Sequence, residues 1–458
     1  MRVTAGGRIL KTWKPDKQWS SQRGLNPTRT VAVSFGVIIA LGALLLLLPP
    51  MSRSGTSAGF FLSLYTATPA ACVTGSVLTD TAAQWSLGGQ VVLLLLFQLG
   101  ALGFMMAYSL FLLLFRRELV LSQRVTLASA LGLKNVGGIT RLVRHGLIGT
   151  LLFEGIGTVL LALRFIPLFG FGKGLWTSLF HSVSAFCNAG FDLMGGDLSR
   201  FISDPYVLFI HMALTVVGGL GFFVWEDILL ARRWRKLSLY SRLAITSTAA
   251  LLLIGWVYFL ATEWSNPATL GGMETEARVT AALFQSVNLR TAGFAVFPQG
   301  GMKETSQVVS LLFMVIGGCS GSTACGIKTV TVLVLGVAVW SGLIGRDDVL
   351  IGGRTVPRRL VRNALTLTLS MLLAILAGSL IMSHIQGGAY LPVLFETVAS
   401  IGTVGLSVGV PLCQASRWVM LILMYLGRVG ILSFSLAFLT RRHKDVKLRY
   451  PDCELFIG

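Results

Sequence analysis

Five clusters of basic residues divide this 458-residue chain into four long apolar blocks. Of its 38 lysines and arginines, 28 lie in these clusters, which span residues 2–29, 116–144, 232–242, 346–362 and 441–449. Only 12% of all residues are charged, about half the share found in soluble domains. The chain is therefore a polytopic membrane protein, and the positive-inside rule places all five clusters in the cytoplasm. The net charge of +19 follows from these loops, so we expect a membrane lipid environment and no nucleic-acid partner.

Each block contains more apolar sequence than one span requires, since about 20 residues cross the hydrocarbon core. Every block has a long segment, a short segment and another long segment. The short segments cover residues 59–71, 174–186, 277–288 and 390–401. Their length favours re-entrant half-helices over full spans, and polar residues such as His181 and Gln285 argue against twelve full spans. We expect an all-α fold with eight transmembrane helices, four half-helices and both termini inside.

The four short segments also end alike. Aligned from an aromatic residue, they read YTATPAACVTG, FHSVSAFCNAG, FQSVNLRTAG and FETVASIGTVG, and they end at Gly75, Gly190, Gly293 and Gly405. The intervals between these glycines are 115, 103 and 112 residues, which indicates four similar units. The predicted repeats cover residues 29–115, 142–231, 240–343 and 359–440, between cytoplasmic tails at 1–28 and 441–458.

Four loops that end in glycine can surround one ion path. Backbone carbonyls at membrane depth are tolerated where they line a cavity, and a ring of carbonyls can replace the hydration shell of K⁺. Half-helices that end at the ring would direct their negative dipole ends toward a cation. The predicted filter residues are Val73, Thr74, Gly75, Asn188, Ala189, Gly190, Thr291, Ala292, Gly293, Thr403, Val404 and Gly405. The alternative is that these glycines only allow close helix packing. His181 and Glu396 are interpreted as helix-start or packing groups.

The motifs RTAGF (290–294), NAGF (188–191) and TVGL (403–406) resemble those of the Trk/Ktr/HKT superfamily of potassium transporters, and the chain is most similar to its KtrB-like branch. The resemblance implies potassium uptake across the bacterial inner membrane, with the sodium dependence left open. It implies a homodimer and a cytosolic, nucleotide-binding regulatory subunit, a KtrA-like ring. ATP or ADP would bind that partner, so this chain needs no cofactor and holds K⁺ only at the filter.

A second unusual stretch interrupts the apolar run 308–343. Its small residues, from Gly317 onward, should break the helix. By resemblance this stretch is an intramembrane gate loop, comprising Gly317, Gly318, Cys319, Ser320, Gly321, Ser322, Thr323, Ala324, Cys325 and Gly326, with Lys328 after it. The family pattern has Pro and Gly where Ser320 and Cys325 stand here. The resemblance also matches Arg428 to an arginine that opposes cation passage when the gate is closed.

Other interpretations use the same residues. Arg428 could snorkel, or pair with Glu154 or Glu226. The stretch from Gly321 to Thr329 is one insertion away from a phosphate-binding motif, although no strand precedes it. Ser320 with His211 could form the centre of an intramembrane serine protease. A secondary transporter of another solute is the remaining alternative. We expect a transporter and no enzyme activity.

Overall fold

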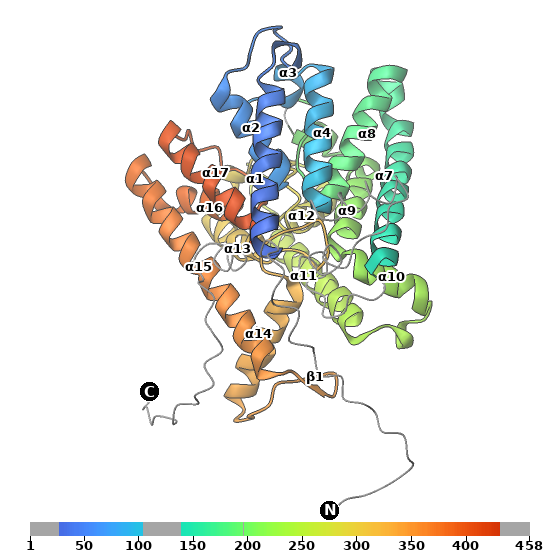
Figure 1. Cartoon of the computed structure of the whole chain (residues 1–458), viewed down its shortest axis with the longest axis vertical. Coiled ribbons are helices and arrows are strands. Elements are labelled where there is room, and N and C mark those ends of the chain that lie inside the picture. Colours follow the sequence, from blue (N-terminus) through green and yellow to red (C-terminus); the bar gives the residue numbers. More distant parts are fainter. Residues whose placement is uncertain (1–26, 104–138, 196, 431–458) are drawn as a thin grey trace, which may run out of the picture.

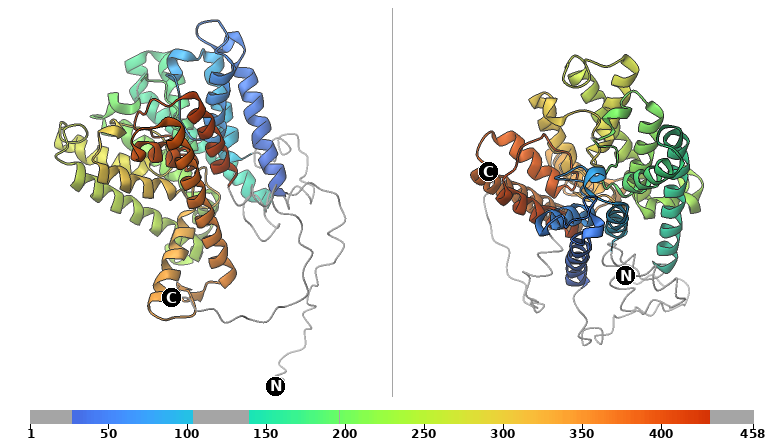
Figure 2. Two further views of the ribbon diagram at one scale, coloured as in Figure 1. Left: turned by 90° about the vertical axis from the view of Figure 1, so that its left-hand side faces the viewer. Right: turned by 90° about the horizontal axis from the view of Figure 1, so that it is seen from above.

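The computed structural model describes residues 27–103, 139–195 and 197–430. The long helices fall into four groups that follow one another around a common centre, as the view from above in Figure 2 shows. In chain order they are α1 (Pro27–Leu46), α2 (Phe60–Cys72) and α4 (Leu87–Leu102); α7 (Ile139–Phe169), α8 (Phe171–Cys187), α9 (Pro205–Leu220) and α10 (Phe222–Ala231); α11 (Leu239–Glu263), α12 (Thr275–Asn288), α13 (Glu304–Val315) and α14 (Thr329–Leu343); and α15 (Arg358–Gln386), α16 (Tyr390–Ile401) and α17 (Gln414–Val429).

Short elements connect these helices (Figure 1). They are η2 (Pro49–Met51), α3 (Thr81–Gln84), η3 (Asp197–Phe201), η4 (Trp234–Lys236), η5 (Gln299–Gly301) and a hairpin of β1 (Leu350–Ile351) and β2 (Arg354–Thr355). The hairpin is antiparallel, with Leu350 opposite Thr355. Apart from it the described chain is helical, so the all-helical membrane fold expected from the sequence is confirmed. The predicted tails, and the ends of repeats 1 and 4, lie wholly or largely outside the described residues.

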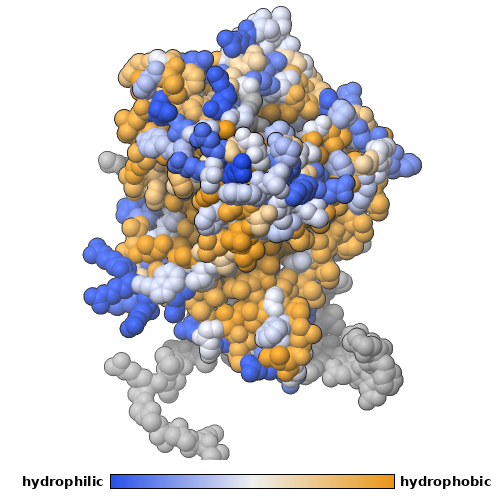
Figure 3. All heavy atoms as spheres, turned by 180° about the vertical axis from the view of Figure 1, so that it is seen from behind, coloured by the Kyte–Doolittle hydropathy of each residue, from blue (hydrophilic) through white to orange (hydrophobic). Residues whose placement is uncertain are grey.

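The first helix of every repeat is long and apolar enough to cross a membrane alone. These four stretches are Arg29–Leu46, Val143–Phe169, Leu239–Glu263 and Arg358–Gln386. Many large apolar side chains on them face outward, including Leu151 and Leu163 on α7 and Leu373 on α15. Figure 3 shows one broad apolar face of this kind. Lipid is the solvent that such a surface requires.

The second long helix is interrupted in repeats 2 and 3. The sequence counts residues 205–231 as one of the eight spans, and the structure divides this stretch into α9 and α10, which meet at 90°. Gly221 lies between them with a φ of 90°, and the N–H of Phe222 donates to the carbonyl of Gly321, 2.9 Å away. In repeat 3, residues 316–328 separate α13 from α14. Both α4 and α17 end at a glycine of positive φ, Gly103 and Gly430.

The short helices α2, α8, α12 and α16 have 13, 17, 14 and 12 residues. Each of these helices contains one fully buried aromatic residue at the start of the aligned motif. These residues are Tyr65, Phe180, Phe284 and Phe395, and all are at most 1% exposed. These rings lie in one continuous apolar core with their neighbours from all four repeats. The core therefore fixes the four half-helices relative to one another.

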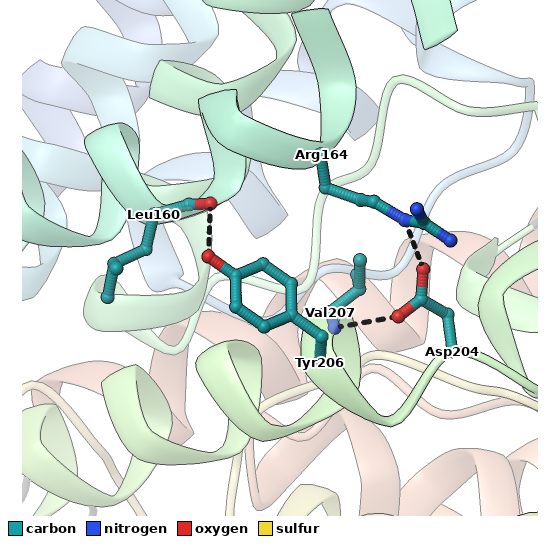
Figure 4. Close-up of polar contacts among 5 residues, drawn as sticks. All are labelled: Leu160, Arg164, Asp204, Tyr206 and Val207. Carbon is teal, nitrogen blue, oxygen red and sulfur yellow. Dashed lines mark hydrogen bonds and ion pairs between the residues drawn. The ribbon is translucent and has the colours of Figure 1, made fainter. Parts of the chain in front are cut away.

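A polar cluster joins the first and third helices of repeat 2 (Figure 4). Arg164 Nε of α7 donates to Asp204 Oδ2 at 2.7 Å, and Asp204 Oδ1 caps α9 by accepting from the N–H of Val207 at 3.4 Å. The hydroxyl of Tyr206 donates to the carbonyl of Leu160 at 2.9 Å. These contacts hold the start of α9 against α7, with α8 between them in the chain.

The basic clusters predict which ends of the helices face the cytoplasm. We expect a cysteine at Thr355, in the hairpin beside a basic cluster, to resist an impermeant thiol reagent added outside whole cells. A cysteine at Ser265, between α11 and α12, should react. Both side chains are exposed, so accessibility within the protein is matched. The test uses single cysteines in a chain that lacks its six native ones, and the reverse labelling pattern would contradict the orientation.

Candidate functional site

The four segments that follow the half-helices share an unusual backbone conformation. Among the described residues, only five that are not glycine have positive φ, and four of them begin these segments: Val73 (58°), Asn188 (59°), Thr291 (66°) and Thr403 (52°). The glycine two residues later also has positive φ: Gly75 (81°), Gly190 (70°), Gly293 (80°) and Gly405 (81°). The four segments therefore adopt the same left-handed pattern although their residues differ.

This pattern orients carbonyl groups. The middle residues, Thr74, Ala189, Ala292 and Val404, do not have positive φ, so left-handed and ordinary conformations alternate. Such alternation turns successive peptide groups toward one side, whereas carbonyls in a regular strand point to opposite sides. A left-handed residue other than glycine costs about 1–3 kcal/mol and persists only where its surroundings impose it. Repetition of this cost at four equivalent positions indicates a functional constraint.

The four segments form a closed ring. A Cβ atom added to Gly75 would lie 2.6 Å from the carbonyl oxygen of Ala189. Added to Gly190, it would lie 2.9 Å from the carbonyl oxygen of Ala292. The same contacts join Gly293 to Val404, at 2.7 Å, and Gly405 to Thr74. Each glycine thus faces the middle carbonyl of the next repeat, in the order 1, 2, 3, 4 and back to 1.

The C-terminal ends of the half-helices add partial negative charge near the ring. They end at Cys72, Cys187, Asn288 and Ile401, one to three residues before the segments. Helix C-termini carry a partial negative charge, so four such ends converge on the same place. A ring of carbonyls with four negative dipole ends behind it can bind a desolvated cation, and it has no side chain that could perform acid or base catalysis.

Residues 316–328 form a compact loop between α13 and α14. Its two ends lie side by side, because the N–H of Gly317 donates to Ile327 at 3.0 Å and the N–H of Ile327 donates to Val315 at 3.1 Å. The tip binds repeat 2, where the amides of Cys319 and Thr323 donate to the carbonyls of Gly219 and Gly218. The loop is thus held by backbone bonds to the break between α9 and α10.

Side-chain hydrogen bonds also fix the predicted gate loop. Tyr240 accepts from the N–H of Ser320 at 2.9 Å and donates to its carbonyl at 3.3 Å. Thr323 Oγ1 donates to the carbonyl of Phe186, in the last turn of α8, at 3.2 Å. Lys328 Nζ donates to the carbonyl of Ala324 at 2.8 Å. The loop therefore contacts the end of a half-helix directly.

Arg428 of α17 binds the same loop. Its Nη1 lies 2.9 Å from the carbonyl oxygen of Thr323 and 2.7 Å from Cys325 Sγ. Its Nη2 donates to the carbonyl of Gly100 in repeat 1, and the guanidinium lies 5.8 Å from the centre of the Phe35 ring. One arginine from repeat 4 thus joins the loop of repeat 3 to repeat 1.

The structure gives these residues other partners than the alternative interpretations require. Glu154 accepts from Gln98 at 3.2 Å, Glu226 lies 3.7 Å from His145, and neither forms an ion pair with Arg428 within the described residues. The ring nitrogens of His211 contact His181, at 3.2 Å, and the carbonyl of Val207, at 2.8 Å. They are not available to activate Ser320 as a nucleophile.

Arg290 was not predicted as a site residue. Its side chain is 8% exposed, and Nη2 donates to the carbonyl of Gly317 at 3.2 Å and to Thr329 Oγ1 at 2.8 Å. Arg290 immediately precedes the ring residue Thr291, so it connects the ring to both ends of the loop. Its place in the RTAGF motif is the signal that could have identified it.

The chain belongs to the TrkH family of cation transport proteins, whose model matches residues 2–447. It is 37% identical to the potassium/sodium uptake protein NtpJ of Enterococcus hirae, over 95% of this chain and 98% of that one. It is 34% identical to the Ktr system potassium uptake protein B of Bacillus subtilis, over 94% and 97%. The fold matches the crystal structure of TrkH from Vibrio parahaemolyticus with a TM-score of 0.74 and 17% identity, covering 92% of this chain and 86% of that one. These findings confirm the family predicted from the sequence motifs, and the chain is a transporter and not an enzyme.

The ring geometry predicts the effect of a side chain at Gly293. Because its added Cβ would lie 2.7 Å from the carbonyl oxygen of Val404, we expect Gly293→Ser to lower Rb⁺ uptake into proteoliposomes and to weaken discrimination between cations. Gly155→Ser is the matched control, since a Cβ on this helical glycine meets nothing within 4 Å. Parental flux and discrimination in G293S would contradict the assignment of the ring.

Proposed function

We propose that this chain takes up K⁺ across the bacterial inner membrane, through the ring formed by the four filter segments. The observation that carries the proposal is the closed cycle of equivalent carbonyls, from Thr74, Ala189, Ala292 and Val404. Dehydrated K⁺ is the ion that such carbonyl rings accommodate. The relatives described as potassium uptake proteins support the same ion, and the sodium in the name of the Enterococcus protein makes a sodium requirement worth testing.

A buried hydroxyl in the ring supports an ion site. Thr74 Oγ1 is buried and has no hydrogen-bond partner within the described part of the chain. Leaving such a group unpaired costs about 1–3 kcal/mol, which a cation or its water would offset. Thr74 also contributes one of the four ring carbonyls.

The loop at residues 316–328 is proposed to be the gate, with Arg428 holding it closed. The contacts of Arg428 to Thr323 and Cys325 support this role. Its charge would also repel a cation in the path, by about 4 kcal/mol for unit charges 4 Å apart at an effective dielectric constant of 20, an upper guide where water is present. Arg290 would then transmit movement of the loop to the filter of repeat 3.

Regulation is proposed to come from partners. The chain would form a homodimer and bind a cytosolic nucleotide-binding ring, with ATP or ADP on that ring. The Ktr system of Bacillus subtilis, to which one relative belongs by name, supports a multi-subunit arrangement. The basic loops and the tail at residues 450–458 are the proposed docking surface, and that tail lies outside the described residues.

The function is tested by growth and by flux. We expect the gene to restore growth at low K⁺ to a bacterium that lacks its own K⁺ uptake systems, and the purified chain to catalyse Rb⁺ uptake into proteoliposomes. Both assays are run with and without Na⁺ and with and without a regulatory subunit. Failure of both assays in all conditions, or transport of another solute in preference to Rb⁺, would overturn the proposal.

The gate is tested at Arg428. Replacing it by Gln removes the charge and weakens hydrogen bonds that contribute about 1.5–3 kcal/mol each when a charged group donates. A loss of 1.4 kcal/mol from the closed state raises the open population roughly tenfold. We therefore expect Arg428→Gln to increase Rb⁺ flux and to reduce its dependence on the partner's nucleotide.

Deletion of residues 318–325 should act in the same direction. Arg164→Gln is the matched control, because Arg164 also lies near the end of a span but pairs with Asp204, away from the loop. If both altered proteins assemble and still transport less than the parent in every condition, the loop is a structural kink and the gate lies elsewhere.

A further inference from the structure

Each half-helix sends at least one polar side chain to the segment that follows its filter glycine. In repeat 4, Glu396 Oε1 accepts from Ser407 Oγ at 2.5 Å and from the N–H of Val408 at 3.0 Å. In repeat 2, His181 Nε2 accepts from the N–H of Leu193 at 3.2 Å. Leu193 and Val408 both lie three residues beyond the filter glycine of their repeat, so the two contacts are equivalent.

In repeats 1 and 3 the corresponding contact is made by different functional groups, hydroxyls in repeat 1 and amides in repeat 3. Gln285 exchanges two amide hydrogen bonds with Gln299, at 2.7 and 3.2 Å, and Gln299 also donates to the carbonyl of Phe297 at 3.1 Å. In repeat 1 the residue after the aromatic ring is Thr66, which bonds its own helix at Leu62. There the aromatic residue itself carries a hydroxyl, and the oxygens of Tyr65 and Ser76 lie 3.4 Å apart.

These polar side chains are buried at positions where an apolar residue would cost less free energy of desolvation. His181, Gln285 and Glu396 are 0%, 1% and 3% exposed. A buried polar group costs free energy unless it is hydrogen-bonded, so a polar residue at this position in three repeats calls for a reason. The three differ in charge and shape, and what they share is the bond to the chain beyond the filter.

The hydrogen bonds of His181 show how firmly its contact is fixed. His211 Nδ1 faces the carbonyl of Val207, at 2.8 Å, and must therefore donate. His211 Nε2 is then an acceptor for His181 Nδ1, 3.2 Å away, which leaves His181 Nε2 to accept from Leu193. Each ring nitrogen of the two histidines therefore makes one hydrogen bond, and its role as donor or acceptor agrees with a single neutral tautomer of each ring.

Repeat 4 lacks a second side-chain contact that repeats 2 and 3 make. In repeat 2, Ser184 Oγ accepts from the N–H of Phe191 at 3.0 Å, and in repeat 3 Asn288 Oδ1 accepts from the N–H of Phe294 at 3.3 Å. The matching position is Ala399 in repeat 4, which has no side chain that could make this bond. Within the described residues, Glu396 is the side chain of α16 that fixes residues 407–408.

We propose that Glu396 is a positioning residue for cation selectivity, and that it acts by holding the filter segment of repeat 4 against its half-helix. The inference rests on the proposed potassium function, and it adds a residue that does not itself line the ring. Loss of the bonds from Ser407 and Val408 would let Gly405 and Val404 shift, which widens the ring at one of its four sides.

The test compares Rb⁺ uptake and its inhibition by Na⁺ in three variants. Glu396→Leu removes the acceptor, and we expect the preference for Rb⁺ over Na⁺ to fall roughly tenfold, as for one lost bond to a buried carboxylate. Glu396→Gln keeps an acceptor oxygen at the same place and should retain most of the preference. Thr66→Val is the matched control, buried at the equivalent position without reaching its filter segment, and it should behave as the parent.

Ser407→Ala removes the other end of the contact from an exposed position, so it tests the proposal even where E396L does not assemble. We expect a smaller loss of preference in the same direction. Parental selectivity in both E396L and S407A would overturn the proposal, and so would equal damage in E396Q and E396L, which would indicate the charge and not the contact. Rb⁺ uptake by the unaltered chain is measured in the same series, so a failure of the potassium function is recognised separately.

Discussion

Four residues other than glycine are held in a left-handed backbone conformation, and the rest of the structure serves to keep them there. At about 1–3 kcal/mol each, Val73, Asn188, Thr291 and Thr403 store roughly 4–12 kcal/mol together, comparable with the whole stability of many proteins. Packing must supply that free energy. It comes from the four half-helices, whose buried rings join one core, and from the lipid-facing first helices that enclose them.

Two arginines, one buried and one half-buried, connect the loop to the rest of the protein. Arg290 connects filter residue Thr291 to both ends of the loop, and Arg428 connects the loop to repeat 1. Arginine suits these connections because its guanidinium group is planar, remains charged and carries several N–H donors in a fixed arrangement. Since the loop also contacts Phe186 at the end of α8, movement of the loop can reach the filter from two repeats.

The repeat pattern could be predicted because its signal is local: an aromatic ring, a fixed spacing and a glycine in each short segment. The break at Gly221 could not, because that glycine stands in an apolar run and the turn is fixed by Gly321, a hundred residues away. The sequence interpretation of His181 and Glu396 as helix-start or packing groups missed their contacts for the same reason. Their hydrogen-bond partners lie in the segments that follow the filter glycines, and these segments approach the half-helices only in the folded protein.

The proposed function requires one cation site among the carbonyls of Thr74, Ala189, Ala292 and Val404. Anomalous diffraction from crystals grown in Rb⁺ tests it most directly, since Rb⁺ replaces K⁺ and can be located without reference to transport. We expect an anomalous peak on the axis of the ring, which is lost when Na⁺ replaces Rb⁺. Ordered Rb⁺ elsewhere in the chain, with none at the ring, would contradict it.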